Sequence, residues 1–173
     1  MKKLISLLTL IITLFLSFSI SFASTLEGNI TWQYNDFIGT KPDVGANIYL
    51  YSYGMNPADS FGNASNEEDF LIVPKKLCGV YHVRADGYGH YAINNLPAGK
   101  YLVFVVSSKT VRDLTDNNDC DLRWQVMNRY SLLSKDTFMN LSGAAMNKST
   151  FSTITIPENG AEIFSYDFGY TWI

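Results

Sequence analysis

Apolar runs separated by turn residues organise the chain from residue 24 onward. Leu26–Tyr34 places apolar Ile30 and Trp32 at alternate positions, which predicts a strand with one buried face. Tyr101 to Val106 is an unbroken apolar run, and such a run predicts a central strand covered on both faces. Further strands are expected at residues 46–53, 70–73, 78–84, 88–93, 150–156 and 161–170. The pattern predicts an all-β protein of about seven to nine strands in one domain.

Two dipeptides predict turns between neighbouring strands. Asp86-Gly87 separates residues 78–84 from 88–93, and Asn159-Gly160 separates residues 150–156 from 161–170. Both dipeptides are typical of two-residue hairpin loops, so each pair of strands is expected to form a hairpin.

Two polar stretches predict surface loops. Residues 54–69 are rich in Gly, Asn, Ser and acidic residues and predict an insertion, and residues 110–121 are polar and acidic. Residues 122–133 are ambiguous, because Leu122, Val126 and Tyr130 recur at helical spacing while Val126 and Tyr130 also suit a strand. A short helix or an irregular segment is expected there.

Several motifs resemble those of a known family. Asp86-Gly87-Tyr88-Gly89-His90-Tyr91, followed by Leu96-Pro97-Ala98-Gly99-Lys100-Tyr101 and an apolar strand, resembles the hallmark of the carboxypeptidase regulatory-like domain family, a branch of the transthyretin-like β-sandwiches. The segment Gly39 to Tyr51 resembles the second strand of that family, and Tyr166–Tyr170 resembles the last strand of B-type repeats in bacterial surface adhesins. The resemblance implies a Greek-key β-sandwich over residues 24–173. It leaves function open, because such sandwiches host many roles.

The N-terminus has the pattern of an export signal. Lys2-Lys3 precedes the apolar run Leu4 to Ile20, and Ser21-Phe22-Ala23 offers small residues to a signal peptidase. We expect residues 1–23 to be removed. The alternative is an uncleaved membrane anchor, but the apolar run is at the short end for a spanning helix and the small-residue site follows it at once. The mature protein is therefore expected to be secreted, extracellular or periplasmic, without stable membrane insertion.

The charge and the aromatic content of the chain limit the classes of partner that it can bind. Removal of residues 1–23 takes away two of the thirteen basic residues and no acidic ones, so the mature charge is 11 − 16 = −5. This balance argues against nucleic acid as a partner and against docking on anionic lipid. The chain has eleven Tyr, eleven Phe and three Trp, which can form a sugar-stacking or partner-binding surface, or simply fill the core.

Cys78 and Cys120 are the two cysteines, 42 positions apart. Outside the cytoplasm such a pair invites a disulfide, which the chain-entropy model values at ~4 kcal/mol. Two free buried thiols are the alternative, since the sequence does not show that the two side chains meet.

Two groups of residues are weak metal candidates. Asp116, Asn118, Asp119 and Asp121 offer oxygen ligands that suit Ca²⁺. The EF-hand pattern is missing, however, and a solvated loop is the favoured explanation. His82 and His90 lie symmetrically about Asp86 and would face each other in a hairpin with a three-residue loop. Ordinary cross-strand packing is the expected role of both histidines, and no cofactor is predicted.

No catalytic motif stands out, so the chain is expected not to be an enzyme. It has no nucleophile elbow, phosphate-binding Gly-rich loop or Cys-x-x-Cys motif. Transthyretin-like hydrolases of a purine breakdown product need several His residues and a fixed C-terminal tetrapeptide, whereas this chain has two His and ends Gly-Tyr-Thr-Trp-Ile. The Lys–Asn isopeptide bond of related adhesins is not predicted, because residues 26–34 lack Lys and residues 161–173 lack Asn.

Two functional hypotheses remain. The first is an exported, non-catalytic module that binds a glycan or an extracellular or envelope protein at the bacterial surface through loops 54–69 and 109–121, with Tyr51, Tyr53 and Phe61 as aromatic contacts. The second is a structural or assembly subunit of a surface or pilus-like structure, in which exposed edge strands pair with a neighbour.

Overall fold

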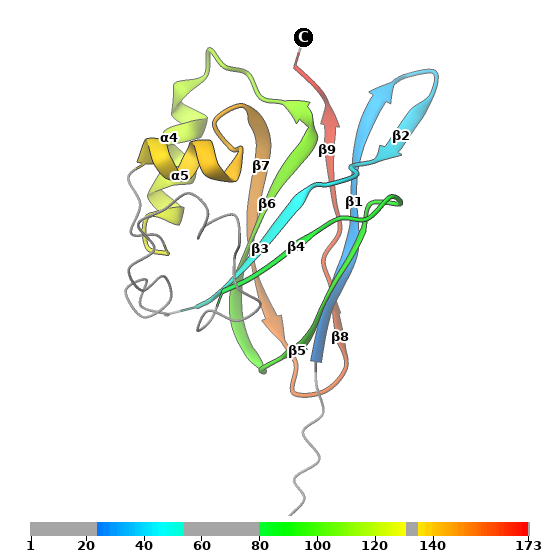
Figure 1. Ribbon diagram of the computed structural model, residues 1–173, viewed down its shortest axis with the longest axis vertical. Coiled ribbons are helices and arrows are strands. Elements are labelled where there is room, and N and C mark those ends of the chain that lie inside the picture. The colour runs from blue at the N-terminus through cyan, green and yellow to red at the C-terminus, as the bar shows by residue number, and fades with distance from the viewer. Residues whose placement is uncertain (1–23, 54–79, 131–134, 173) are drawn as a thin grey trace, which may run out of the picture.

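Two β-sheets face each other across a hydrophobic core in the computed structural model, which describes residues 24–53, 80–130 and 135–172 (Figure 1). The first sheet is built around β1 (Ser24–Asn35), which pairs antiparallel with β2 (Gly39–Pro42) and β5 (His90–Leu96) and parallel with β8 (Ala161–Ile163) and β9 (Tyr166–Tyr170). The second sheet is antiparallel in the order β4 (Val80–Arg84), β3 (Asn47–Ser52), β6 (Gly99–Val111) and β7 (Asn147–Ile156). The described residues thus contain nine strands, and the predicted all-β sandwich is confirmed.

Two short helices form a third layer on the outer face of the second sheet (Figure 1). They are α4 (Asn117–Met127) and α5 (Lys135–Ser142). Within the described ranges neither helix is long and apolar enough to cross a membrane. The helix expected within residues 122–133 is confirmed as far as Met127, whereas the loop expected over residues 110–121 is wrong at both ends, because β6 continues to Val111 and α4 begins at Asn117.

The apolar run of β6 is buried on both faces, as its sequence predicts. Tyr101, Val103 and Val105 point into the core between the two sheets, where they meet residues such as Leu26 and Ile48. The alternate residues Leu102, Phe104 and Val106 point the other way, into a second apolar cluster beneath the helices. The helix layer follows from this pattern, because those three side chains would otherwise lie in water.

The Asp86-Gly87 turn joins the two sheets and does not close a hairpin. On one side β4 pairs with β3, and on the other β5 pairs with β1. Asp86 still forms a local turn, because its carboxylate accepts hydrogen bonds from the N–H groups of Tyr88 (2.8 Å) and His90 (3.0 Å). The predicted hairpin is therefore wrong. The turn residues reverse the chain locally, as their sequence predicts, but the next strand packs in the opposite sheet.

Asn159-Gly160 behaves in the same way, since β7 belongs to the second sheet while β8 joins β1 in the first. The single strand expected over residues 161–170 is split into β8 and β9. At the break, Phe164 donates its N–H to Glu27 O (2.9 Å) and Ser165 Oγ accepts the N–H of Asn29 (3.0 Å). Gly28 allows this approach, because a Cβ there would lie 1.9 Å from Phe164 O.

Several sequence predictions fall outside the described residues. They are the signal peptide over 1–23, the insertion over 54–69, the strand over 70–73, and the positions of Phe61 and Cys78. Cys120 lies in α4, but its side chain is likewise outside the described part. The disulfide therefore stays a prediction.

A fully buried carboxylate joins the β2–β3 connection to the end of β6. Asp43 is 0% exposed, and its Oδ1 accepts the N–H of Ser108 (3.0 Å) while its Oδ2 accepts the hydroxyl of Ser107. Ser107 Oγ in turn accepts the N–H groups of Lys109 (3.1 Å) and Thr110 (2.8 Å). The Ser107 hydroxyl hydrogen is thus committed to Asp43, and the site requires a carboxylate that accepts at both oxygens.

We expect Asp43→Asn to lower the free energy of unfolding by about 2 kcal/mol, because the amide nitrogen cannot accept a hydrogen bond and charge-assisted bonds are the stronger kind. Urea unfolding of the mature protein measures the change. Asp167→Asn is the matched control, since Asp167 is exposed on β9 and bonded to Thr31 (3.0 Å) and Gln33 (3.2 Å). Equal effects of the two substitutions would contradict a special role for Asp43.

Candidate functional site: a groove between the second sheet and α4

A groove of about 310 Å³ opens between the second sheet and the C-terminal end of α4. Its floor comes from β6 and β7, one end comes from the residue that follows β3, and one wall comes from α4 and the two residues beyond Asn128. The lining is part aromatic, part aliphatic and part polar: Tyr53, Leu102, Gln125, Val126, Arg129, Tyr130, Phe151 and Thr153.

Tyr53 presents an aromatic ring at one end of the groove. Its side chain is 51% exposed, and its N–H donates to Lys100 O (2.8 Å), which holds the chain beside β6 just after β3 ends. Lys100 Nζ lies 4.5 Å from the ring centroid, a cation–π contact. One of the three aromatic residues predicted from sequence therefore lies in a groove.

Tyr130 supplies a hydroxyl group to the groove, and its aromatic ring is packed in the core. The residue is 6% exposed, and its ring packs 5.3 Å from that of Tyr51. Its hydroxyl has no hydrogen-bond partner among the described residues, although Tyr130 lines the groove. Burial and the neighbouring Tyr53 raise the pKa of Tyr130, and Arg129 acts in the opposite direction, so the phenol stays neutral at physiological pH.

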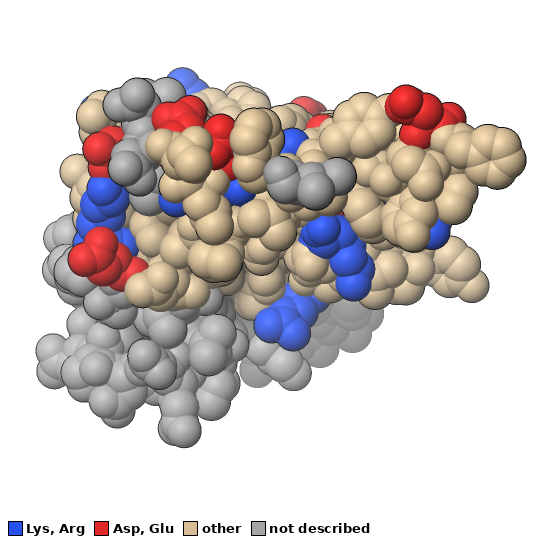
Figure 2. Space-filling model, turned by 90° about the horizontal axis from the view of Figure 1, so that it is seen from above, with Lys and Arg blue, Asp and Glu red and all other residues tan. Residues whose placement is uncertain are grey.

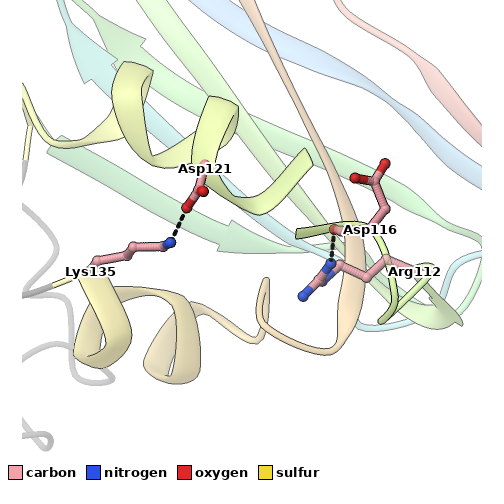
Figure 3. Close-up of polar contacts among 4 residues, drawn as sticks. All are labelled: Arg112, Asp116, Asp121 and Lys135. Atoms are coloured by element: carbon pink, nitrogen blue, oxygen red, sulfur yellow. Dashed lines mark hydrogen bonds and ion pairs between the residues drawn. The ribbon is translucent and has the colours of Figure 1, made fainter. Parts of the chain in front are cut away.

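Buried polar contacts hold α4, and with it the wall of the groove, in place (Figure 3). Arg112, 9% exposed, donates to three main-chain carbonyls: Nη1 to Asp113 O (3.0 Å) and Asp116 O (2.9 Å), and Nε to Ala145 O (2.8 Å). The first two carbonyls lie just before α4 and the third lies just after α5. An ion pair between Lys135 and Asp121 joins the two helices directly.

The other predicted site residues lie elsewhere. Tyr51 is 1% exposed and packs in the cluster beneath the helices, so its ring cannot contact a ligand. The carboxylate of Asp121 pairs with Lys135, and the main-chain carbonyl of Asp116 accepts a hydrogen bond from Arg112. The side chains of Asn118 and Asp119 fall outside the described part. No group of three or more His, Cys, Asp or Glu side chains suited to a metal ion occurs among the described residues. Calcium binding stays an untested prediction.

His82 and His90 do not face each other, because they belong to different sheets. His82 pairs with Tyr49 across β3, and its ring stacks on that of Tyr49 at 4.5 Å. His90 pairs with Asn29 on β1. The geometry needed for a shared metal is therefore missing between these two residues.

His82 makes stability depend on pH. Its Nε2 lies 3.0 Å from Asn47 Oδ1, which also accepts the Nε–H of Arg84 (3.1 Å). Burial, with Arg84 adding to it, lowers the pKa of His82 from 6.5 to about 4. The unfolded chain therefore binds a proton more readily than the folded one, so this contribution is complete above pH 6.5 and is lost as pH falls towards 4.

We expect the wild-type protein to lose about 1–2 kcal/mol more stability than His82→Gln between pH 6.5 and 4, after allowance for the partial exposure of His82. Chemical unfolding at a series of pH values measures the difference. His90→Gln, at an exposed position of the other sheet, is expected to follow the wild-type profile. Coincident profiles for wild type and His82→Gln would refute the assignment.

A second cavity, of about 440 Å³, lies where the edges of the two sheets approach each other. Its lining comes from Tyr81, His82 and Val83 on β4 and from residues 92–95 on β5. Within the described residues, β4 and β5 each pair with one strand only, so each presents one unpaired edge here.

The outer surface carries further exposed aromatic residues away from both cavities. Phe37 at the tip of the β1–β2 hairpin is 97% exposed, and Tyr34 on the same hairpin has Lys41 Nζ 3.9 Å from its ring centroid. In the view from above, uncharged residues cover most of the described surface, and acidic residues gather over the side of the helices and at the opposite tip (Figure 2).

Comparisons with known proteins give likenesses of fold only. No family model matches the chain, and no curated protein matches it. Among solved structures it is similar to a minor pilin of Streptococcus agalactiae (12% identity, 89% of this chain, TM-score 0.47) and covers 47% of that pilin chain. It is also similar to a protein of Pseudomonas aeruginosa suggested to bind carbohydrate (10% identity, 88% of this chain and 93% of the other, TM-score 0.44).

A third likeness is to the 5-hydroxyisourate hydrolase of Klebsiella pneumoniae (13% identity, 84% of this chain and 86% of the other, TM-score 0.35). All three TM-scores are below 0.5, so function has to be argued from the residues of this chain. Membership of the carboxypeptidase regulatory-like family likewise stays a prediction from its motifs.

Proposed function

We propose that the chain is an exported, non-catalytic β-sandwich that binds a glycan in the groove between Tyr53 and α4. The observation that carries the proposal is the pairing of an exposed ring, Tyr53, with an unpartnered hydroxyl on a buried ring, Tyr130. Export to the cell surface or envelope rests on the signal-peptide pattern of residues 1–23.

The chemistry of the lining suits a sugar. An exposed aromatic ring can stack on the C–H face of a pyranose, and sugar hydroxyls need donors and acceptors around that face. Gln125 offers both in its amide, Thr153 and Tyr130 offer hydroxyls, and Arg129 offers N–H donors. The volume lies within the range of small-ligand sites, about 300–1,000 Å³.

The same lining supports binding without catalysis. The lining residues that the structure describes include no Asp, Glu, His or Cys. Glycoside hydrolysis uses a pair of carboxyl groups across the bond, and nucleophilic mechanisms need a base beside the nucleophile. The lining residues offer neither arrangement, so they favour a module that holds a saccharide.

We expect Tyr53→Ala to weaken glycan binding about tenfold, equivalent to about 1.4 kcal/mol, because the stacking surface is lost. A glycan array with purified residues 24–173 identifies the ligand, and titration calorimetry then measures the affinity. Tyr53 is half exposed, so the substitution leaves the core intact.

Tyr34→Ala is the matched control for Tyr53→Ala. Tyr34 is 47% exposed and has a lysine over its ring, as Tyr53 does, but it lies on the β1–β2 hairpin. We expect its removal to leave binding unchanged. An array without any bound glycan, or an equal loss in both variants, would count against the groove.

The second candidate function is that of an assembly subunit. It is favoured by the two sheet edges that border the 440 Å³ cavity, since unpaired edges can accept an extended strand from a neighbouring subunit. Main-chain hydrogen bonds along β4 or β5 would supply the affinity, and the cavity would receive alternate side chains of the incoming strand.

For an assembly subunit, the mass of the mature protein in solution is expected to rise with concentration. Light scattering over a wide concentration range measures it. A mass that stays at the monomer value throughout would weigh heavily against self-assembly through these edges.

A further inference from the structure

The groove carries positive charge on an acidic protein. The mature chain has a net charge of −5, yet among the described residues that line the groove Arg129 alone is formally charged. Lys100 adds a second cation at the end of the groove, where its ammonium lies over the ring of Tyr53. The protein as a whole is negatively charged, but these two cations make the groove locally positive, which favours binding of anions there.

We propose that the glycan bound in this groove is an acidic saccharide, whose carboxylate, sulfate or phosphate group lies between Arg129 and Lys100 beside the hydroxyl of Tyr130. The inference rests on the proposed function, because it names the class of saccharide that the same groove takes. Tyr53 would stack on the sugar ring, while the two cations and the hydroxyl would bind its acidic group.

Arg129 is available for this role. It is exposed and makes no hydrogen bond or ion pair with any residue in the described ranges. Asp121, an acidic residue of the adjoining helix, is engaged by Lys135 and does not compete for it. A guanidinium offers five donors in a planar fork that matches an oxyanion, so a free guanidinium at the mouth of a polar groove favours an acidic ligand.

Tyr130 adds a donor that is already oriented. Its ring is fixed by packing on Tyr51, so the hydroxyl loses little freedom when a ligand binds. The hydroxyl lacks a hydrogen-bond partner among the described residues, and an acidic oxygen would accept its hydrogen. Lys100 supplies a flexible point charge at the other side of the Tyr53 ring.

The test compares saccharides that differ only in charge. Calorimetry with a short oligogalacturonate and with its carboxyl-reduced counterpart measures the contribution of the carboxylates, and an array with uronate, sulfated, phosphorylated and neutral members identifies the preferred anion. We expect acidic members to bind at least about tenfold more tightly than neutral ones, and the preference to shrink as salt rises from about 50 to about 500 mM.

Arg129→Gln is expected to weaken binding of the acidic ligand about tenfold and binding of the neutral counterpart much less, because the glutamine amide still offers N–H donors to sugar hydroxyls. Lys100→Gln is expected to act in the same direction. Lys41→Gln is the matched control, because Lys41 also lies over a tyrosine ring, at 3.9 Å from Tyr34, but far from the groove in the fold. The side chains of Arg129, Lys100 and Lys41 all lie at the surface. We therefore expect the circular dichroism spectra of the three variants to match that of the wild-type protein.

The outcomes separate this inference from the proposed function. Equal binding of acidic and neutral saccharides, with the loss in Tyr53→Ala retained, overturns the acidic preference and keeps the glycan-binding groove. Acidic binding that is insensitive to both Arg129→Gln and Lys100→Gln overturns the inference as well, because the anion then binds elsewhere. An array in which no saccharide of any charge binds overturns both.

Discussion

The two-sided burial of β6 is the constraint on which the rest of the structure depends. A strand whose successive side chains are all apolar needs a cover on each face, and a single opposing sheet supplies only one. The first sheet covers Tyr101, Val103 and Val105, and the pair α4 and α5 covers Leu102, Phe104 and Val106. The helix layer is therefore part of the folding solution, and the groove exists because this layer ends before the sheet does. Leu102 belongs both to the buried cluster and to the floor of the groove.

Polar groups at the end of β6 connect this core to the loops. Asp43 accepts hydrogen bonds from Ser107 and Ser108, and Arg112, just beyond the strand, donates to carbonyls on both helical connections. Buried charges are tolerated when they are hydrogen-bonded, and main-chain and hydroxyl groups bond to both of these. They fix where the chain leaves the sheet, and so where α4 lies relative to β6 and β7.

The groove combines residues from four segments that are far apart in sequence. Tyr53 follows β3, Leu102 is on β6, Tyr130 follows α4, and Phe151 is on β7. A rigid sheet and a packed helix hold these side chains, so the groove is formed without the help of a ligand. Arg129 and Lys100 lie at its exposed edge, whereas Leu102 and Phe151 make its floor mostly apolar.

Periodicity in the sequence predicted most of the described strands and the cover on both faces of β6, because these properties depend on side chains close together along the chain. It did not predict β2, which lies in a stretch that reads as a loop. The sequence also singled out Tyr53, which lines the groove. The side chains of Tyr51 and Tyr53 lie on the same face of the second sheet. Only the extent of the helix layer leaves Tyr51 buried and Tyr53 exposed.

The turns at Asp86-Gly87 and Asn159-Gly160 reverse the chain locally. Strand pairing depends on distant strands, however, so the two hairpins expected there are connections between the two sheets. Helical spacing predicted a short helix or an irregular segment at Tyr130, and in the structure this residue follows the end of α4. Its meeting with Thr153 and Tyr53 comes from packing between segments, which no local pattern records.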